Sequence, residues 1–353
     1  MASHIIEEFT TLIDNAKSLK SKGWQFKVRN YNKVVNILKS HKDLEGDLTT
    51  NKILEILREG GMKFSGETGS TPYKSQILIK IEKILTEGSL SIELDEKSKI
   101  LKVLNSIPEI GPSKSLQLYD KGIRSIEDLI KNPKWINRKQ LIGLRHYKDL
   151  VLKISRNEMT IWSNSLDSLI GDLISKQYND IKIENMELAG SYRRGYKESG
   201  DIDLYLAVNK LDKKLMFDIR DKLVEEGYLD KLDVISCGER KMMCIVKLDS
   251  KSPARHLDIF IYPKNEYAFA LLFATGSGEF NIRMRNYALK NKFSLSDKGI
   301  RYKNNNGDLI HMKEIKEKIN KSEIETEQDI FRFLGLEYIQ PSDRTPIVKL
   351  NKI

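Results

Sequence analysis

The spacing of apolar residues changes once along the chain, near residue 183, and this change limits the folds that the chain can adopt. Before it, apolar residues recur every three or four positions, as in residues 49–61 and 75–88, which is typical of amphipathic helices. After it, segments such as 201–208 and 256–262 alternate or run apolar, which indicates strands. The sequence therefore predicts an α plus α+β fold with a mixed, mostly antiparallel sheet.

Turn clusters and changes of period suggest how the chain is divided into domains. Helical patterns dominate the first part, strands and one helix follow, and the last part mixes helices with a hairpin. The predicted segments are 1–93 and 94–153, both helical, then 154–262 with the sheet, 263–342 with mixed structure, and a tail at 343–353.

The charge and the cysteine content of the sequence limit the functions that the protein can have. Lys and Arg number 60 against 50 Asp and Glu, a net charge of +10, which favours a polyanion such as nucleic acid as partner. A Lys-rich surface from a biased genome would give the same excess. Two cysteines and five histidines exclude a disulfide scaffold and a zinc ribbon. Since no signal peptide or apolar run of about 18 residues is found, we expect a soluble, intracellular protein without a membrane partner.

The most specific local pattern is GSYRRGYKESGDIDLYL, which begins at Gly190. Alternate side chains of a strand share a face, so Asp201 and Asp203 should lie together. Such a pair of carboxylates repel each other unless a divalent cation, Mg²⁺ by preference, lies between them. Upstream, Ser191 offers a hydroxyl and Arg194 a guanidinium to a phosphate. A GS pair shortly before DxD is typical of nucleotidyltransferases, and the alternative is an exposed strand with two solvated acids.

A third acid is expected on a neighbouring strand, and HLDIFIYP, residues 256–263, supplies Asp258. This residue stands within an apolar run, where an unpaired carboxylate would be costly. Three carboxylates on adjacent strands suit two metal ions in nucleotidyl transfer.

The segment IPEIGPSKSLQLYDKGI, residues 107–123, predicts a helix-hairpin-helix. Gly111 would expose backbone N–H groups at a helix N-terminus, where a DNA phosphate can bind. Ser113 and Lys114 follow directly. The alternative is an ordinary α-hairpin, and Lys114 favours the phosphate contact.

Together these segments resemble the family X DNA polymerases. The resemblance rests on GSYRRGYKESGDID, on HLDIFIYPKNEYAFALLFATGSGEFNIRMRNYAL and on the helix-hairpin-helix, and it is collinear over about residues 20–342. It implies a lyase-like helical domain, a helix-hairpin-helix subdomain, a palm with the sheet, and a nascent-base-pair-binding subdomain, in the order of the segments above. The implied activity is template-directed gap filling in base excision repair.

The resemblance also implies partners and cofactors. These are gapped or nicked duplex DNA, deoxynucleoside triphosphates, and two Mg²⁺ ions for which Mn²⁺ can substitute. A monovalent cation is implied at the helix-hairpin-helix. The enzyme would act as a monomer, in the nucleus or, if viral, at the site of genome replication or in the virion.

Individual roles follow from the same resemblance. Asp201 and Asp203 would bind both metal ions, and Asp258 only the catalytic one. The implied nucleotide contacts are Lys153 (where the family often has Arg), Gly190, Ser191, Arg194, Ser199, Gly200, Phe273, Gly276 and Asn281. The implied DNA contacts are Lys27, Tyr31, Lys33, Gly111, Ser113, Lys114 and Arg285, and the monovalent cation would be held by Asn105, Ile107 and Ile110.

A second activity is implied by SQILIKIEKILTEGSL, residues 75–90, which aligns with the family's nucleophile helix. Lys80 falls on the reactive lysine, whose neutral amine forms a Schiff base with a 5′-deoxyribose phosphate. Neighbouring cations such as Lys83 or Lys74 would lower the pKa of the Lys80 amine. The alternative is a solvated surface lysine.

Some positions depart from the family pattern. Pro108–Glu109 replaces a small residue followed by Gly, His256 stands where Arg is common, and STPYK at 70–74 replaces an LPGVG-like hairpin.

Three other functions stay open: a template-independent or RNA-tailing nucleotidyltransferase, a DNA end-joining polymerase, and a non-catalytic DNA-binding module.

Overall fold

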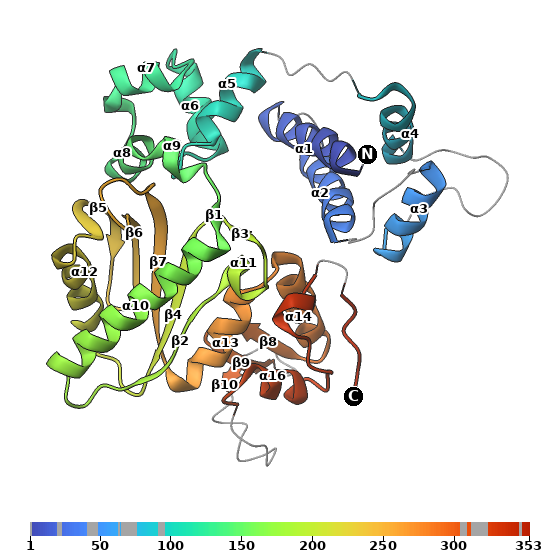
Figure 1. Ribbon diagram of the computed structural model, residues 1–353. Coiled ribbons are helices and arrows are strands. Elements are labelled where there is room, and N and C mark those ends of the chain that lie inside the picture. Colours follow the sequence, from blue (N-terminus) through green and yellow to red (C-terminus); the bar gives the residue numbers. More distant parts are fainter. Residues whose placement is uncertain are drawn as a thin grey trace. The chain divides into compact units, whose positions relative to one another are not determined.

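The computed structural model describes residues 2–19, 23–40, 49–62, 64, 76–90, 96–303, 309–311, 324–345 and 348–353. The chain forms two compact units, Met1–Leu144 and Arg145–Ile353. Figure 1 shows helices in the first and a central sheet with surrounding helices in the second. The predicted hairpin at 70–74 lies outside the described residues.

The first unit is helical, as its periodicity predicts. Side chains cap several helices: Thr49 accepts a hydrogen bond from the backbone N–H of Lys52, and Ser125 accepts one from Asp128. The apolar stripes face inward, and Ile53 is fully buried. The helices are α1 (Ala2–Leu19), α2 (Trp24–Ser40), α3 (Thr50–Glu59), α4 (Gln76–Glu87), α5 (Glu96–Asn105), α6 (Pro112–Asp120), α7 (Ile126–Lys131) and α8 (Arg138–Arg145), with a 3₁₀ turn at Pro133–Trp135.

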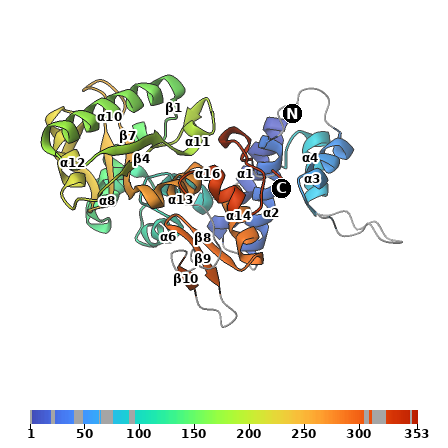
Figure 2. The ribbon, with the colours of Figure 1, turned by 90° about the horizontal axis from the view of Figure 1, so that it is seen from below.

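The second unit is built on a sheet with the strand order β2-β4-β7-β6-β5. β4 and β7 are parallel, and the other neighbouring pairs are antiparallel, so the prediction of a mixed sheet is confirmed. One face packs against α10 and α12 and the other against α13, and Figure 2 shows α10 and α13 on opposite sides of β4. The elements are α10 (Arg156–Gln177), β2 (Ile183–Leu188), β4 (Ile202–Val208), α12 (Leu215–Glu225), β5 (Leu229–Cys237), β6 (Lys241–Val246), β7 (Arg255–Pro263) and α13 (Lys264–Thr275).

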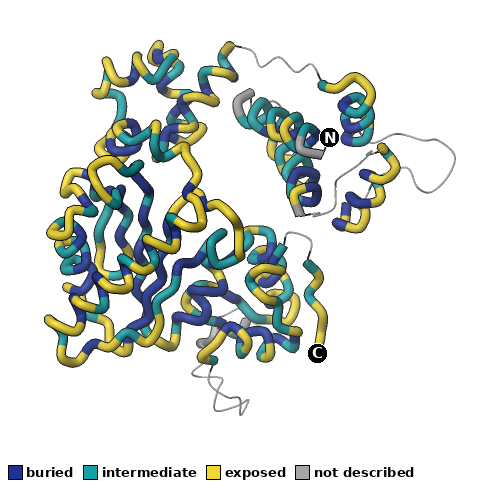
Figure 3. Tube along the Cα trace, viewed as in Figure 1, coloured by how far each residue is buried: buried dark blue, intermediate teal, exposed yellow. Residues whose placement is uncertain are grey.

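Smaller elements complete this unit. A second apolar cluster joins α14, the β8–β9 hairpin and α16, with Phe280, Met284 and Phe331 buried in it. In Figure 3 the buried residues follow the strands and the inner sides of the helices. The remaining elements are α9 (Tyr147–Leu150), β1 (Ile154–Ser155), α11 (Gly190–Arg193), β3 (Glu198–Ser199), α14 (Gly278–Lys290), β8 (Phe293–Ser296), β9 (Gly299–Lys303), β10 (Leu309–His311), α16 (Glu327–Phe333) and a 3₁₀ turn at Pro341–Asp343. Among the described helices, none combines the length and the apolar character that crossing a membrane requires.

Candidate active site

Three predicted acids meet on one face of the sheet. β4 and β7 are adjacent and parallel, and their register pairs Asp203 with Asp258. Asp201 lies in the bend directly before β4. The alternate residues of both strands, such as Leu204 and Ile259, are buried on the opposite face against α10 and α12. The carboxylates therefore lie on the face of the sheet turned away from those two helices.

The three acids lie near enough for their charges to act on one another. Burial, together with the charges of Asp201 and Asp258, raises the pKa of Asp203 to about 7. Burial also raises the pKa of Asp258, while His256 and Lys241 act in the opposite direction. Nearby cationic side chains, such as Lys241, therefore neutralise the negative charge of the three acids only in part.

The Asp258 carboxylate has only long contacts with cations among the described residues. The Nζ atom of Lys241 lies 3.4 Å from its Oδ2, and Nε2 of His256 lies 3.5 Å from its Oδ1. Both Oδ1 of Asp258 and Nε2 of His256 are buried without a hydrogen bond to any described residue. Because a buried, unpartnered carboxylate oxygen is costly, this atom has the character of a ligand for an added cation.

The side chains supply the oxygen donors that a hard cation needs, but they are not arranged as a complete metal site. Within the described residues, no group of three or more His, Cys, Asp or Glu side chains is gathered tightly enough to hold a metal ion as they stand. The donors are nevertheless oxygen atoms that repel one another, with Asp203 and Asp258 half-buried and Asp201 exposed, and such donors suit Mg²⁺. Gly190 borders the same space, because a Cβ there would lie 3.1 Å from Oδ2 of Asp203. Its φ of +57° also favours glycine.

The loop that precedes β4 gathers the predicted phosphate ligands. Gly190 begins the short helix α11, and the Ser191 hydroxyl donates a hydrogen bond of 3.0 Å to Ser199 on β3. A Cβ on Gly200 would lie 3.7 Å from Nζ of Lys153, which places this lysine beside the loop. The structure thus brings together hydroxyl, ammonium and backbone groups that can bind a phosphate.

Arg194 connects this loop to the turn after α13. Its Nη1 donates a hydrogen bond of 2.6 Å to the carbonyl of Thr275, and its buried Nε has no partner among the described residues. Gly276 lies next to the guanidinium, since a Cβ at this position would be 3.4 Å from Nη1 of Arg194. The predicted phosphate and sugar contacts therefore adjoin one another.

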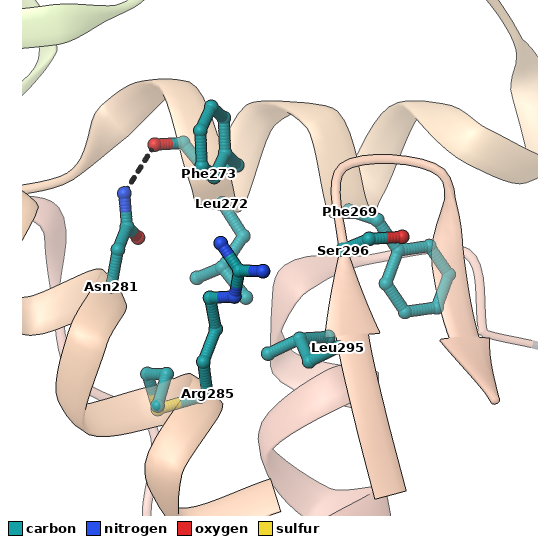
Figure 4. A pocket seen from close by; sticks show the side chains of 8 residues that line it. Phe269, Leu272, Phe273, Asn281, Arg285, Leu295 and Ser296 are labelled. Carbon is teal, nitrogen blue, oxygen red and sulfur yellow. Dashed lines mark hydrogen bonds between the residues drawn. The ribbon is translucent and has the colours of Figure 1, made fainter. Parts of the chain in front are cut away.

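The predicted base contacts lie around a pocket between α13, α14 and β8, shown in Figure 4. Asn281 donates a hydrogen bond of 2.7 Å from Nδ2 to the carbonyl of Phe273, whose side chain is 46% exposed. The pocket is shallow, with a volume of about 10 Å³, which is room for one water molecule, so a base would rest against these side chains rather than inside the pocket. The lining residues are Phe269, Leu272, Phe273, Asn281, Met284, Arg285, Leu295 and Ser296.

A buried ion network supports the loop and was not predicted from the sequence. Arg193 pairs with Glu187 and Glu327, both at 2.8 Å, and donates a hydrogen bond to Thr275. Glu327 also pairs at 2.6 Å with Arg344, which is almost fully buried. The available signal was Arg193, the first arginine of SYRR, but its partners Glu327 and Thr275 are far away in the sequence.

In the first unit, the helix-hairpin-helix forms despite its unusual sequence. Glu109 adopts a φ of +66°, the conformation for which the family uses Gly. Gly111 is the N-cap residue of α6 and no side chain caps this helix end, which leaves it suited to a phosphate.

The predicted cation ligands of the hairpin have other contacts. The resemblance implies backbone carbonyls as ligands, and that of Ile107 already accepts a hydrogen bond of 3.0 Å from the backbone of Ile110. The Asn105 side chain, which is not one of the predicted ligand groups, accepts a hydrogen bond of 2.7 Å from Ser115. A carbonyl oxygen has a second lone pair, so the carbonyl of Ile107 retains capacity for a cation.

The predicted nucleophile Lys80 is half-buried on α4. Burial lowers the pKa of its amine, and the charge of Lys27 on α2 lowers it further. The neighbouring cation is thus Lys27 and not Lys83, which forms a 3.6 Å ion pair with Glu87. Lys74, the other predicted cation, lies outside the described residues.

The other predicted phosphate ligands of this unit lie on α2. Tyr31 is one helical turn from Lys27, and its ring packs edge-on against Phe9 with centroids 5.6 Å apart. The Lys33 ammonium donates a long hydrogen bond of 3.5 Å to the carbonyl of Gly61. Among the residues predicted for the second activity, the structure best supports a site formed by Lys27, Tyr31 and Lys80.

Three consecutive regions of the sequence match known protein families. The family model described as DNA polymerase beta palm matches residues 153–264, and the one described as DNA polymerase beta thumb matches 270–345. The fingers domain of DNA polymerase lambda matches 102–151. These matches adjoin one another and cover most of the chain.

Individual relatives support the same family. DNA polymerase lambda of Rattus norvegicus is 26% identical over 363 residues, which is 97% of this chain and 56% of the relative. DNA polymerase lambda of Arabidopsis thaliana is 26% identical over 75% of this chain and 50% of its own length. The type-X family protein pol4 of Schizosaccharomyces pombe is 28% identical over 71% and 49%, respectively. The chain spans about half the length of these relatives, and it belongs to the family X DNA polymerases.

Proposed function

We propose that the chain is a template-directed DNA polymerase that fills short gaps during base excision repair. The observation that carries this proposal is the pairing of Asp203 with Asp258 on adjacent parallel strands, with Asp201 beside them. Family membership supports it, because the relatives named above are DNA polymerases.

In this proposal Asp201 and Asp203 hold two Mg²⁺ ions and Asp258 holds one of them, with Mn²⁺ as a substitute. When bound, the ions activate the primer 3′-hydroxyl and neutralise charge on the phosphates. Lys241 orients Asp258 through its contact at 3.4 Å.

Ser191, Ser199, Gly200, Arg194 and Lys153 bind the triphosphate. The hydroxyl pair and Gly200 supply close contacts, and Arg194 supplies a charged donor whose Nε is still unpartnered. Lys153 acts as a point charge, since it lacks the paired donors of the arginine that the family often has there.

Beyond the triphosphate, Phe273 and Gly276 border the sugar, Asn281 contacts the incoming base and Arg285 contacts the template base. In the first unit, Gly111, Ser113 and Lys114 bind a DNA phosphate at the N-terminus of α6, next to a monovalent cation held by Asn105, Ile107 and Ile110. The net charge of +10 supports DNA as the partner.

We extend the proposal to removal of a 5′-deoxyribose phosphate by Lys80. The lowered pKa of its amine supports this role, because a Schiff base requires the neutral form. Lys27, Tyr31 and Lys33 would bind the 5′-phosphate, and β-elimination would then release the strand.

The proposed organisation keeps a lyase domain at 1–93, a helix-hairpin-helix subdomain at 94–153, a palm at 154–262, a base-pair-binding subdomain at 263–342 and a tail. The enzyme would act as a monomer where the DNA is repaired, in the nucleus or at a site of viral genome replication. The second candidate is a template-independent nucleotidyltransferase, which the same carboxylates would serve.

The test is nucleotide insertion on a duplex with a one-nucleotide gap, with each of the four templating bases in turn. We expect insertion of the complementary nucleotide only, and little extension of the same primer as a single strand. Equal extension of the single strand, or insertion that ignores the templating base, would overturn the proposal in favour of the second candidate.

A further inference from the structure

A hydrogen bond links the wall of the base pocket to the strand that carries Asp258. Leu295 and Ser296 line the pocket, and Asp297 follows them in the turn between β8 and β9. The Tyr262 hydroxyl, near the end of β7, donates a hydrogen bond of 3.2 Å to Oδ2 of Asp297. The contact therefore ties the hairpin to the sheet at a point four residues beyond Asp258.

The Tyr262 ring is held firmly in this position. Only 8% of the residue is exposed, and its ring stacks on Tyr205 with centroids 5.9 Å apart and an angle of 7° between the planes. The Arg240 guanidinium lies 5.1 Å from the ring centroid and is fixed by Glu266 at 2.6 Å. The hydroxyl is thus aimed at Asp297 by neighbours that leave the ring little freedom.

The stack continues from Tyr262 to the carboxylates. Tyr205 stacks on Phe260 with centroids 4.6 Å apart, and the Lys241 ammonium lies 4.7 Å from the Phe260 centroid. Lys241 also lies 3.4 Å from Asp258. Since alternate residues of a strand share a face, Tyr205 and Phe260 are the next residues on that face after Asp203 and Asp258. A chain of contacts therefore runs from the pocket wall to the proposed metal ligands.

We infer that the Tyr262–Asp297 hydrogen bond is a latch that holds the β8–β9 hairpin in place for nucleotide binding. This makes Tyr262 and Asp297 positioning residues, and the inference rests on the proposed polymerase function. The hydroxyl is the informative group, because a phenylalanine would fill the aromatic stack equally well. A hydrogen bond to a charged acceptor that is partly shielded from water is strong enough to shift the position of a short hairpin.

The test uses Tyr262→Phe, Asp297→Ala and their double variant in the full chain. Tyr287→Phe on α14 is the matched control, since the Tyr287 hydroxyl forms no hydrogen bond with a described residue. Hydrogen exchange of the amides of residues 293–303 is measured without DNA. Affinity for the complementary nucleotide and the rate at saturation are then measured on gapped DNA.

We expect each single variant to speed exchange of the hairpin about tenfold and to weaken nucleotide affinity about tenfold, with a smaller change in the saturated rate. The double variant should be no worse than either single one, since both remove the same bond. Asp297→Asn, which keeps an acceptor, should recover part of the loss.

Unchanged exchange in Tyr262→Phe, or additive effects in the double variant, would overturn the latch. Faster exchange with unaltered nucleotide affinity would overturn the positioning role. The exchange experiment needs no DNA, so it tests the latch even if the wild-type protein inserts no nucleotide, a result that would count against the proposed function instead.

Discussion

Lys80 on α4 and Asp203 on β4 each lie partly buried beside groups of the same charge. The neighbour of the amine is Lys27, and the neighbours of the carboxylate are Asp201 and Asp258. In both places burial is the larger cause and like charge the smaller, so the pKa falls for the lysine and rises for the aspartate. The same physical arrangement thus favours the neutral form of both groups.

The consequences differ because the chemistry differs. A neutral amine is already the nucleophile that a Schiff base needs. A protonated carboxylate is a poor metal ligand, so the aspartates become useful when a divalent cation stabilises their charged form. In the proposed function, the lyase reaction would therefore need no metal, whereas nucleotide insertion would depend on one.

The largest expected effect is that of Asp258→Ala on nucleotide insertion. We expect the rate to fall at least about a thousandfold, because one ligand of the catalytic metal is lost. Binding of gapped DNA should stay within a few fold of the wild-type value, and borohydride trapping through Lys80 should be unaltered. Insertion at near wild-type rate would show that the carboxylates are assigned wrongly.

Next in size is the effect of Lys80→Ala on the lyase reaction. Borohydride trapping on DNA with a 5′-deoxyribose phosphate should fall roughly a hundredfold or more, while insertion is retained. Lys83→Ala on the same helix is the matched control, because Lys83 is paired with Glu87 and should leave trapping intact. If both variants trap like the wild type, the nucleophile lies elsewhere.

A smaller effect is expected when Lys27 is replaced by Gln. Removing this charge lets the pKa of Lys80 rise, so less of the amine is neutral at pH 7. The lyase rate at pH 7 should fall about two- to tenfold, and the rising limb of the pH–rate profile should move to higher pH. Lys27→Arg keeps the charge and should keep the profile. A lower rate with an unmoved profile would mean that Lys27 acts on the 5′-phosphate alone.

Local sequence patterns explain why much of the fold and of the candidate site was predictable. The alternation around Asp258 and the helical spacing around Lys80 are properties of short segments, and both appear in the structure. Glu109 shows that even a departure from the family pattern can be accommodated, since it adopts the left-handed conformation itself. Such a residue has a cost of about 1 kcal/mol relative to glycine.

Contacts between distant segments were not predictable. The register that pairs Asp203 with Asp258, the approach of Lys27 to Lys80, and the Tyr262–Asp297 hydrogen bond depend on how segments pack, which no local pattern encodes. The sequence analysis also did not predict the strand β5 or the helix α10. β5 carries a charged, exposed stretch that includes Leu232 at 62% exposure, which hides its alternation.

The comparison of the two sites is tested most directly by removing divalent metal from one reaction mixture. The substrate is a one-nucleotide gap that bears a 5′-deoxyribose phosphate, with insertion and strand release followed together. With EDTA present, we predict that insertion stops while release by Lys80 continues, and that added Mg²⁺ restores insertion without changing release. Loss of both reactions in EDTA, or persistence of both, would contradict the account.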